Sequence, residues 1–144
     1  MKTLYVSDLD GTLLRSDKTT SDFTNKTINE LVSRGMLFSY ATARSYVTSR
    51  KVTKGIDARI PLIVYNGAFV IDNTSGKLLL SNFFGDDVKN LLDDLVENNI
   101  YPIVYSFLDG VERFSYVYDN CTKGMKDFIR TRKGDRRDNP VNAT

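Results

Sequence analysis

The first part of the chain alternates short apolar runs with longer stretches of helical periodicity. Three apolar, β-prone runs predict strands, the first of them buried, over residues 4–7, 36–40 and 62–65. A helix with one apolar face is expected after Ser21, which can cap it, and a second helix is expected from about Tyr46. Strands that alternate with helices in this way predict a parallel sheet with right-handed crossovers.

From Phe69 onward the pattern changes. Two apolar runs on either side of residues 73–76 predict a β-hairpin, and residues 86–99 have one apolar helical face. Two antiparallel strands and a short helix follow, over residues 101–107, 112–118 and 122–131. The last segment, 132–144, is polar and basic, and it predicts irregular structure. We therefore expect an α/β protein with a parallel core over residues 1–83 and an α+β second domain over residues 84–144.

The composition narrows the classes of function. The chain has 144 residues, a formal net charge of +2, one cysteine and no histidine. A charge this small does not favour binding of nucleic acid. No apolar run approaches the length of a membrane span, and we expect no signal peptide before the first strand. The single Cys121 cannot form an internal disulfide, so we expect a cytoplasmic protein. The lack of histidine excludes Ser-His-Asp and Cys-His catalysis, and a His-ligated zinc site, within this chain.

Two carboxylates at the end of the first predicted strand are the strongest candidates for chemistry. Asp8 and Asp10 stand one residue apart where α/β proteins place their active sites, at the carboxyl end of a parallel strand. One carboxylate can act as a nucleophile and the other as an acid/base. Their mutual repulsion favours a hard cation such as Mg²⁺, with a phosphate as its second partner. Gly11 permits a close approach of the backbone to an anion. The alternative is an Asp-rich turn without chemistry.

The run Asp8-Leu9-Asp10-Gly11-Thr12 resembles the first motif of the haloacid dehalogenase superfamily, in sequence and in its place at the amino terminus. The resemblance implies a Rossmann-like core and a nucleophilic Asp8 that forms an aspartyl-phosphate. It implies that Asp10 protonates the leaving group and then activates water. It also implies a Mg²⁺ site at Asp8 and Asp10, and a phosphate site that includes Gly11 and Thr12. An Asp at position 10 distinguishes the phosphotransferases of this superfamily from its dehalogenases and its ion pumps.

The run Ser39-Tyr40-Ala41-Thr42-Ala43-Arg44-Ser45 resembles the second motif of the Cof-like branch of this superfamily, although that branch usually has Gly where Ala43 stands. The Thr42 hydroxyl and the Ala43 amide can hold a phosphoryl oxygen. The planar fork of Arg44 suits substrate or phosphate. The alternatives are that Thr42 caps the following helix and that Arg44 is a solvated charge.

After the third predicted strand, Asn66-Gly67-Ala68 resembles the asparagine loop of the superfamily, which faces the substrate. Asn66 and Gly67 are therefore candidate substrate-binding residues. Because Asn-Gly is a strong turn pair by itself, an ordinary turn is the alternative.

Two later motifs of the superfamily do not match this chain: a Lys that neutralises phosphate, and an acidic pair that completes the magnesium site. Residues 134–139 are superficially similar to the acidic motif, but no apolar strand precedes them, so we expect a loop of the cap domain there. Lys123 is expected to be a solvated charge at the start of a helix. The chain thus looks like the first half of a family member that ends inside an α+β cap domain, and we expect it to be inactive alone. The uncovered edge of residues 4–7 then favours self-association or a companion chain.

Together with the resemblance, these residues predict a Mg²⁺-dependent phosphatase of small phosphorylated metabolites such as sugar phosphates. A phosphomutase is the alternative with the same chemistry. A non-catalytic phosphate-binding module, or an inactive remnant, is the alternative from another class. Neither nucleic acid nor a membrane is expected as a partner.

Overall fold

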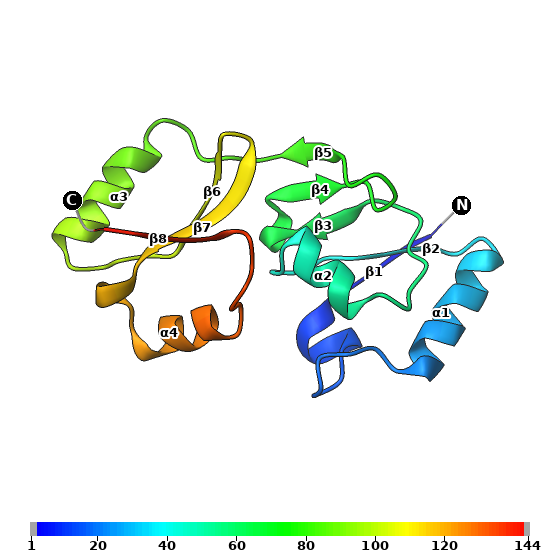
Figure 1. Ribbon diagram of the computed structural model, residues 1–144. Coiled ribbons are helices and arrows are strands. Elements are labelled where there is room, and N and C mark those ends of the chain that lie inside the picture. Colours follow the sequence, from blue (N-terminus) through cyan, green and yellow to red (C-terminus); the bar gives the residue numbers. More distant parts are fainter. Residues whose placement is uncertain (1–2, 143–144) are drawn as a thin grey trace. The chain divides into compact units, whose positions relative to one another are not determined.

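A computed structural model of the chain describes residues 3–142 (Figure 1). The chain forms two compact units, residues 1–83 and residues 84–144. Each unit has its own hydrophobic core. The two units are therefore described one after the other.

The first unit is organised by a parallel sheet, as the alternation of strands and helices predicted. Strand β1 (Leu4–Ser7) pairs in parallel with β2 (Leu37–Tyr40), and the register places Ser7 opposite Tyr40. Strand β3 (Leu62–Val64) joins β2 through one parallel bridge between Ala41 and Ile63. The predicted hairpin follows, because β4 (Phe69–Ile71) pairs antiparallel with both β3 and β5 (Leu78–Ser81).

Two helices make the crossovers between the parallel strands. Helix α1 (Asp22–Ser33) begins after Ser21, whose hydroxyl accepts the amide of Thr24 and so caps the helix as predicted. Helix α2 (Tyr46–Val52) begins at the predicted residue, with Ser45 as its cap. Apolar residues of both crossovers and of the strands form one core, which consists of Leu9, Leu14, Ile28, Val32, Phe38, Tyr40, Ala58, Leu62, Val64 and Ile71.

The expectation that the first strand is buried is wrong. Leu4, Tyr5 and Val6 are 53%, 54% and 45% exposed, whereas Leu62 and Val64 of β3 are fully buried. Within the described residues β1 pairs only with β2, so one edge of β1 and much of its side-chain surface stay open. An apolar strand with an open edge is a template for pairing with another chain.

The second unit combines two helices with a three-stranded sheet. Its helices are α3 (Val88–Glu97) and α4 (Lys123–Arg130). Its strands are β6 (Val104–Leu108), β7 (Val111–Val117) and β8 (Asp138–Val141). Strand β7 lies in the middle, antiparallel to β6 and parallel to β8. Phe114, Tyr116, Cys121 and Ile129 form the core of this unit, and no residue of α3 is buried.

No apolar pattern predicted β8, and the prediction of a loop over residues 134–139 is wrong at its end. Asp138 and Asn139 lie in β8, opposite Phe114 and Ser115 of β7. Polar partners hold this segment: the Tyr116 hydroxyl donates to Asp138 at 2.6 Å, and the Asn139 amide donates to the Ser115 hydroxyl at 2.9 Å. A strand whose side chains are satisfied by hydrogen bonds lacks the apolar alternation from which strands are predicted.

In residues 3–142 no helix combines the length and the apolar character that crossing a membrane requires.

We expect Tyr5→Lys to reduce self-association of the chain, because a charged side chain on an open edge strand opposes pairing with another strand. Sedimentation velocity over a range of protein concentrations measures the effect. Phe23→Lys is the matched control, since Phe23 is 79% exposed on α1 and lies on no sheet edge. A wild-type chain that stays monomeric at all concentrations, or an equal effect of both substitutions, would contradict this expectation.

Candidate active site

The three loops that carry the candidate residues follow the carboxyl ends of β1, β2 and β3. Two backbone hydrogen bonds keep these strand ends level. The amide of Ala41 donates to the carbonyl of Ser7 at 2.9 Å, and the amide of Thr42 donates to the carbonyl of Ile63 at 3.0 Å. The parallel sheet thus brings the candidate residues of all three loops to one edge, as expected for an α/β site.

The first loop presents Asp8 immediately after β1. Residues Leu9–Leu13 form a wide turn, which the amide of Leu14 closes by donating to the carbonyl of Leu9 at 2.8 Å. Leu9 is fully buried and anchors the turn, and Gly11 has a φ of 84°, which favours glycine there. The Thr12 hydroxyl donates to Oδ2 of Asp8 at 3.0 Å. Thr12 therefore orients Asp8, and no described residue hydrogen-bonds to the other oxygen of that carboxylate.

Asp10 has two cationic neighbours. Arg44 donates to both of its carboxylate oxygens, Nε to Oδ2 at 2.6 Å and Nη2 to Oδ1 at 2.7 Å. The ammonium of Lys18 lies 3.6 Å from Oδ1. The hydrogen bonds from Arg44 lower the pKa of Asp10 below its usual value, with help from the charges of Arg44 and Lys18 and against the effect of burial. Asp10 is therefore held as an ionised acceptor.

Arg44 takes a position that the sequence did not indicate. In the structure its guanidinium pairs with Asp10 and only 22% of its side chain is exposed, so the alternative of a solvated charge is wrong. Contact of Arg44 with phosphate or substrate stays a prediction. Lys18 was not among the predicted site residues. It belongs to an unremarkable polar stretch, and only the fold of the turn that carries it brings it near Asp10.

Thr42 is 5% exposed, and its hydroxyl accepts the amide of Arg44 at 3.2 Å. The alternative interpretation of Thr42 as the cap of the next helix is wrong, because Ser45 caps α2. The Thr42 hydroxyl instead orders the turn that positions Arg44. Ala43, between them, is exposed.

The third loop is tied to the second by its backbone. The amide of Tyr65 donates to the carbonyl of Arg44, and the amide of Asn66 donates to the carbonyl of Thr42, each at 3.0 Å. Asn66 has a φ of 55°, a left-handed conformation that Asn tolerates better than most residues. Asn66 and Gly67 are exposed beside the Thr42–Arg44 turn, so the structure brings together the candidate residues of all three loops.

The oxygen donors at this edge fit a Mg²⁺ ion. Mg²⁺ prefers hard oxygen ligands, and it commonly binds through one or two carboxylates while it keeps several waters. Asp8 offers a carboxylate oxygen without a described partner. Because the Asp10 carboxylate is engaged by Arg44, Asp8 is the carboxylate of this loop that stays open to an ion among the described residues. Within residues 3–142, acidic, cysteine or histidine side chains do not gather in groups of three or more that could hold a metal.

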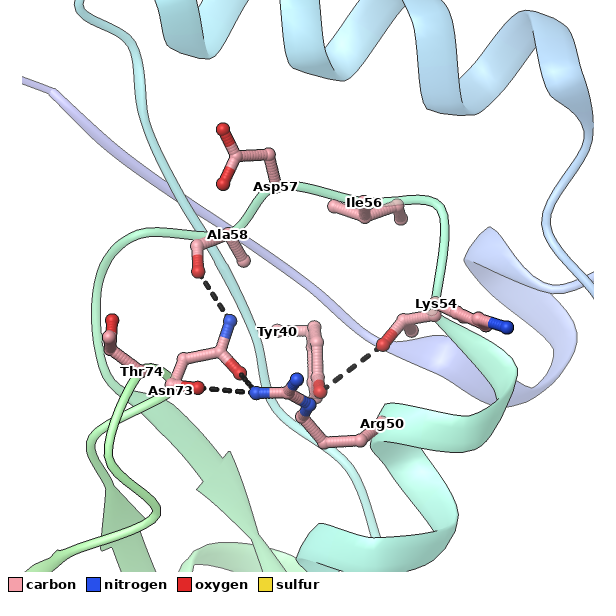
Figure 2. Close-up of a pocket in the computed structure, with 9 residues that line it drawn as sticks. Tyr40, Arg50, Lys54, Ile56, Asp57, Ala58, Asn73 and Thr74 are labelled. Carbon is pink, nitrogen blue, oxygen red and sulfur yellow. Dashed lines mark hydrogen bonds between the residues drawn. The ribbon is translucent and has the colours of Figure 1, made fainter.

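A cavity of about 330 Å³ lies elsewhere in the first unit, at the end of α2 distant from Arg44 (Figure 2). Arg50 points toward Asn73 and donates to its carbonyl and to its side chain, and Asn73 in turn donates to the carbonyl of Ala58. None of the predicted site residues lines this cavity. The candidate chemistry and this cavity are therefore separate features.

Comparison with known proteins gives the family. The family model of the haloacid dehalogenase-like hydrolases matches residues 5–142. The chain belongs to this family. The resemblance to its Cof-like branch is confirmed by the relatives and solved structures that the chain matches.

A 5-amino-6-(5-phospho-D-ribitylamino)uracil phosphatase of Bacillus subtilis is 34% identical over 111 residues, which cover 75% of this chain and 41% of the relative. A phosphatase of the haloalkanoate (HAD) superfamily from Bacteroides thetaiotaomicron has a TM-score of 0.72 at 16% identity, over 99% of this chain and 50% of that one. TM0651 from Thermotoga maritima has a TM-score of 0.67 at 25% identity, over the same shares. The chain thus spans about two fifths to one half of the length of these three proteins.

We expect Arg44→Ala to raise the pKa of Asp10, because the hydrogen bonds that favour the ionised carboxylate are removed. A carbon-detected NMR titration of the Asp10 carboxyl measures this shift. A pKa lowered by folding stabilises the folded state above the unfolded pKa, and this contribution is lost as the pH falls through the folded pKa. The stability difference between wild type and Arg44→Ala should accordingly be present near neutral pH and vanish in strong acid.

Arg59→Ala is the control, since Arg59 pairs with Asp57 and not with Asp10. An Asp10 pKa that is the same in wild type and in Arg44→Ala would show that the pair does not form in solution.

Proposed function

We propose that the protein that carries this chain is a Mg²⁺-dependent phosphatase of small phosphorylated metabolites such as sugar phosphates, acting through an aspartyl-phosphate. The observation that carries the proposal is the placement of Asp8. Its carboxylate follows directly after β1, is oriented by Thr12, and has one oxygen without a described partner at the edge where Asp10 and Arg44 also lie.

Asp8 is the nucleophile of the proposed reaction. Its free carboxylate oxygen attacks phosphorus, a bond forms between Asp8 and the phosphoryl group, and the bond from phosphorus to the ester oxygen breaks. The leaving oxygen takes its proton from Asp10. A water molecule then attacks the aspartyl-phosphate, gives its proton to Asp10, and releases inorganic phosphate and free Asp8.

Arg44 affects the two proton transfers in opposite directions. In the structure both oxygens of Asp10 accept hydrogen bonds from Arg44, as an ionised carboxylate does. The ionised form of Asp10 is the one that can receive a proton from water. Donation to the leaving group requires a protonated Asp10, so one contact with Arg44 must open in that step. Thr42 contributes by holding the turn that positions Arg44.

Mg²⁺ would be held by the carboxylate of Asp8 and the backbone carbonyl of Asp10. When bound, the ion offsets the negative charge that a phosphate brings next to two carboxylates.

The proposed substrate class rests on the relatives. The Bacillus subtilis relative is named for a pyrimidine that carries a phosphorylated ribityl chain, which is a small phosphorylated metabolite. Because this chain matches 41% of that relative, we infer from the similarity the class of substrate and not the individual compound.

A non-catalytic phosphate-binding module is the second candidate, and one observation favours it. The described residues bring Asp8 and Asp10 to the site but no third acidic group. If the protein that carries this chain binds inorganic phosphate but turns over no phosphomonoester, the result supports the module. Turnover of p-nitrophenyl phosphate in the presence of Mg²⁺ would support the phosphatase.

In the protein that carries this chain, we expect Asp8→Asn to lower the kcat for p-nitrophenyl phosphate by about 10³-fold or more, because a neutral amide does not attack phosphorus. Steady-state kinetics with Mg²⁺ measures the loss. Asp22→Asn is the control, since Asp22 is an exposed acid in the first turn of α1 and belongs to none of the three loops. Retention of half the wild-type rate by Asp8→Asn would rule out Asp8 as the nucleophile.

We expect Asp10→Asn to slow turnover of an alkyl phosphate by about 10²–10⁴-fold, which is typical for the loss of a general acid or base. In single-turnover phosphorylation of Asp8, p-nitrophenyl phosphate should suffer less than an alkyl phosphate, because p-nitrophenolate departs without a proton. Rapid-quench kinetics compares the two substrates. Equal slowing of both in this step would show that Asp10 is not the acid.

A further inference from the structure

A tight turn over residues 15–19 brings Lys18 to the candidate site. The amide of Arg15 donates to the carbonyl of Thr19, and the amide of Lys18 donates to the carbonyl of Arg15, each at 2.9 Å. The Asp17 carboxylate accepts three hydrogen bonds: from the Thr19 amide at 3.0 Å, from the Thr19 hydroxyl at 2.7 Å, and from the Arg15 guanidinium at 2.9 Å. The acid of this turn is thus satisfied by its neighbours, and the ammonium of Lys18 extends to Asp10.

The backbone of Lys18 is unusual for a residue with a side chain. Its φ is 63°, in the left-handed region, which Gly, Asn and Asp adopt more readily than Lys. Such conformations gather at functional sites, where the surrounding structure holds them. Here the hydrogen bonds on either side of Lys18 hold the turn closed.

The contact between Lys18 and Asp10 is weak compared with that of Arg44. Arg44 already donates to both Asp10 oxygens at 2.6 and 2.7 Å, whereas Lys18 lies 3.6 Å away, beyond hydrogen-bond distance. The Lys18 side chain is also 65% exposed, and an exposed ion pair contributes little to stability. Lys18 can therefore exchange Asp10 for another anion at small cost.

We propose that Lys18 is a substrate-specificity residue that selects phosphomonoesters with a second anionic group, a carboxylate or phosphate, a few atoms from the ester oxygen. The inference rests on the proposed function, in which Asp10 gives a proton to that oxygen. When the ester oxygen of a bound substrate lies within hydrogen-bond distance of Asp10, the substrate atoms next to that oxygen lie near the Lys18 ammonium. The reason is that the ammonium lies 3.6 Å from the same carboxylate. The flexible stem of Lys18 lets the ammonium follow an anion on these atoms.

Two small probes test the selection by binding, without turnover. Phosphonoacetate carries a carboxylate next to its phosphonate, and methylphosphonate lacks it. We expect the wild-type chain to bind phosphonoacetate about three- to tenfold more tightly than methylphosphonate with Mg²⁺ present, as measured by calorimetry or NMR titration. Lys18→Asn should abolish this preference, because Asn tolerates the left-handed backbone but carries no charge.

Two further variants act as controls. Lys18→Arg should retain the preference, since it keeps the cation. Lys26→Asn removes an exposed lysine of α1 and should also retain it. Equal weakening of both probes in Lys18→Asn would overturn the proposal in favour of a contact with the phosphoryl group itself. An equal effect of Lys26→Asn, or a wild-type chain with no preference or no binding, would overturn it as well.

The proposed phosphatase activity fails by a different result. If the chain prefers phosphonoacetate through Lys18 but the protein that carries it hydrolyses no phosphomonoester, the proposed role of Lys18 stands and the proposed phosphatase activity is wrong. If the protein hydrolyses p-nitrophenyl phosphate but Lys18→Asn does not change the preference for phosphonoacetate over methylphosphonate, the phosphatase activity stands and the proposed role of Lys18 is wrong.

Discussion

Two backbone hydrogen bonds at the end of β2 are the constraint on which the candidate site depends. The amides of Ala41 and Thr42 donate in opposite directions, to β1 and to β3, and so hold three strand ends level. Each strand end is followed by a loop with candidate residues, so the alignment of the strands becomes the alignment of the loops. The backbone bonds from the third loop to the carbonyls of Thr42 and Arg44 extend the same arrangement beyond the sheet.

The charges at this edge are arranged around Asp10 and not shared equally between the two carboxylates. Arg44 and Lys18 both face Asp10, while Asp8 accepts a neutral hydroxyl from Thr12. This difference suits two roles. Among the described residues, Asp8 keeps one carboxylate oxygen without a hydrogen-bond partner, as the proposed nucleophile requires. Asp10 is held in a defined position by a bidentate contact, which restricts its geometry more than a single contact would. A pair of carboxylates in one loop is thereby differentiated by partners that come from elsewhere in the chain.

Much of the fold followed from local patterns. The three strands, the hairpin and the helices of the first unit lie close to their predicted positions, because apolar periodicity and capping residues such as Ser21 act over a few neighbouring residues. Strand β8 escaped prediction, because its polar side chains are satisfied by Tyr116 and Ser115 of another strand. The exposure of β1 was not predicted either, because the same apolar sequence can form a strand that is paired on one edge or on both.

The sequence by itself determined the pair of carboxylates, their place at the end of a parallel strand, and the loops that accompany them. These features are local, and the spacing of Asp8 and Asp10 suffices to show them. Only the tertiary structure decided which groups each carboxylate meets. Arg44 is 34 residues from Asp10 along the chain, and the Lys18 ammonium reaches Asp10 because a closed turn directs it there. Such contacts depend on how strands and loops are placed in space, and no periodicity in the sequence encodes that placement.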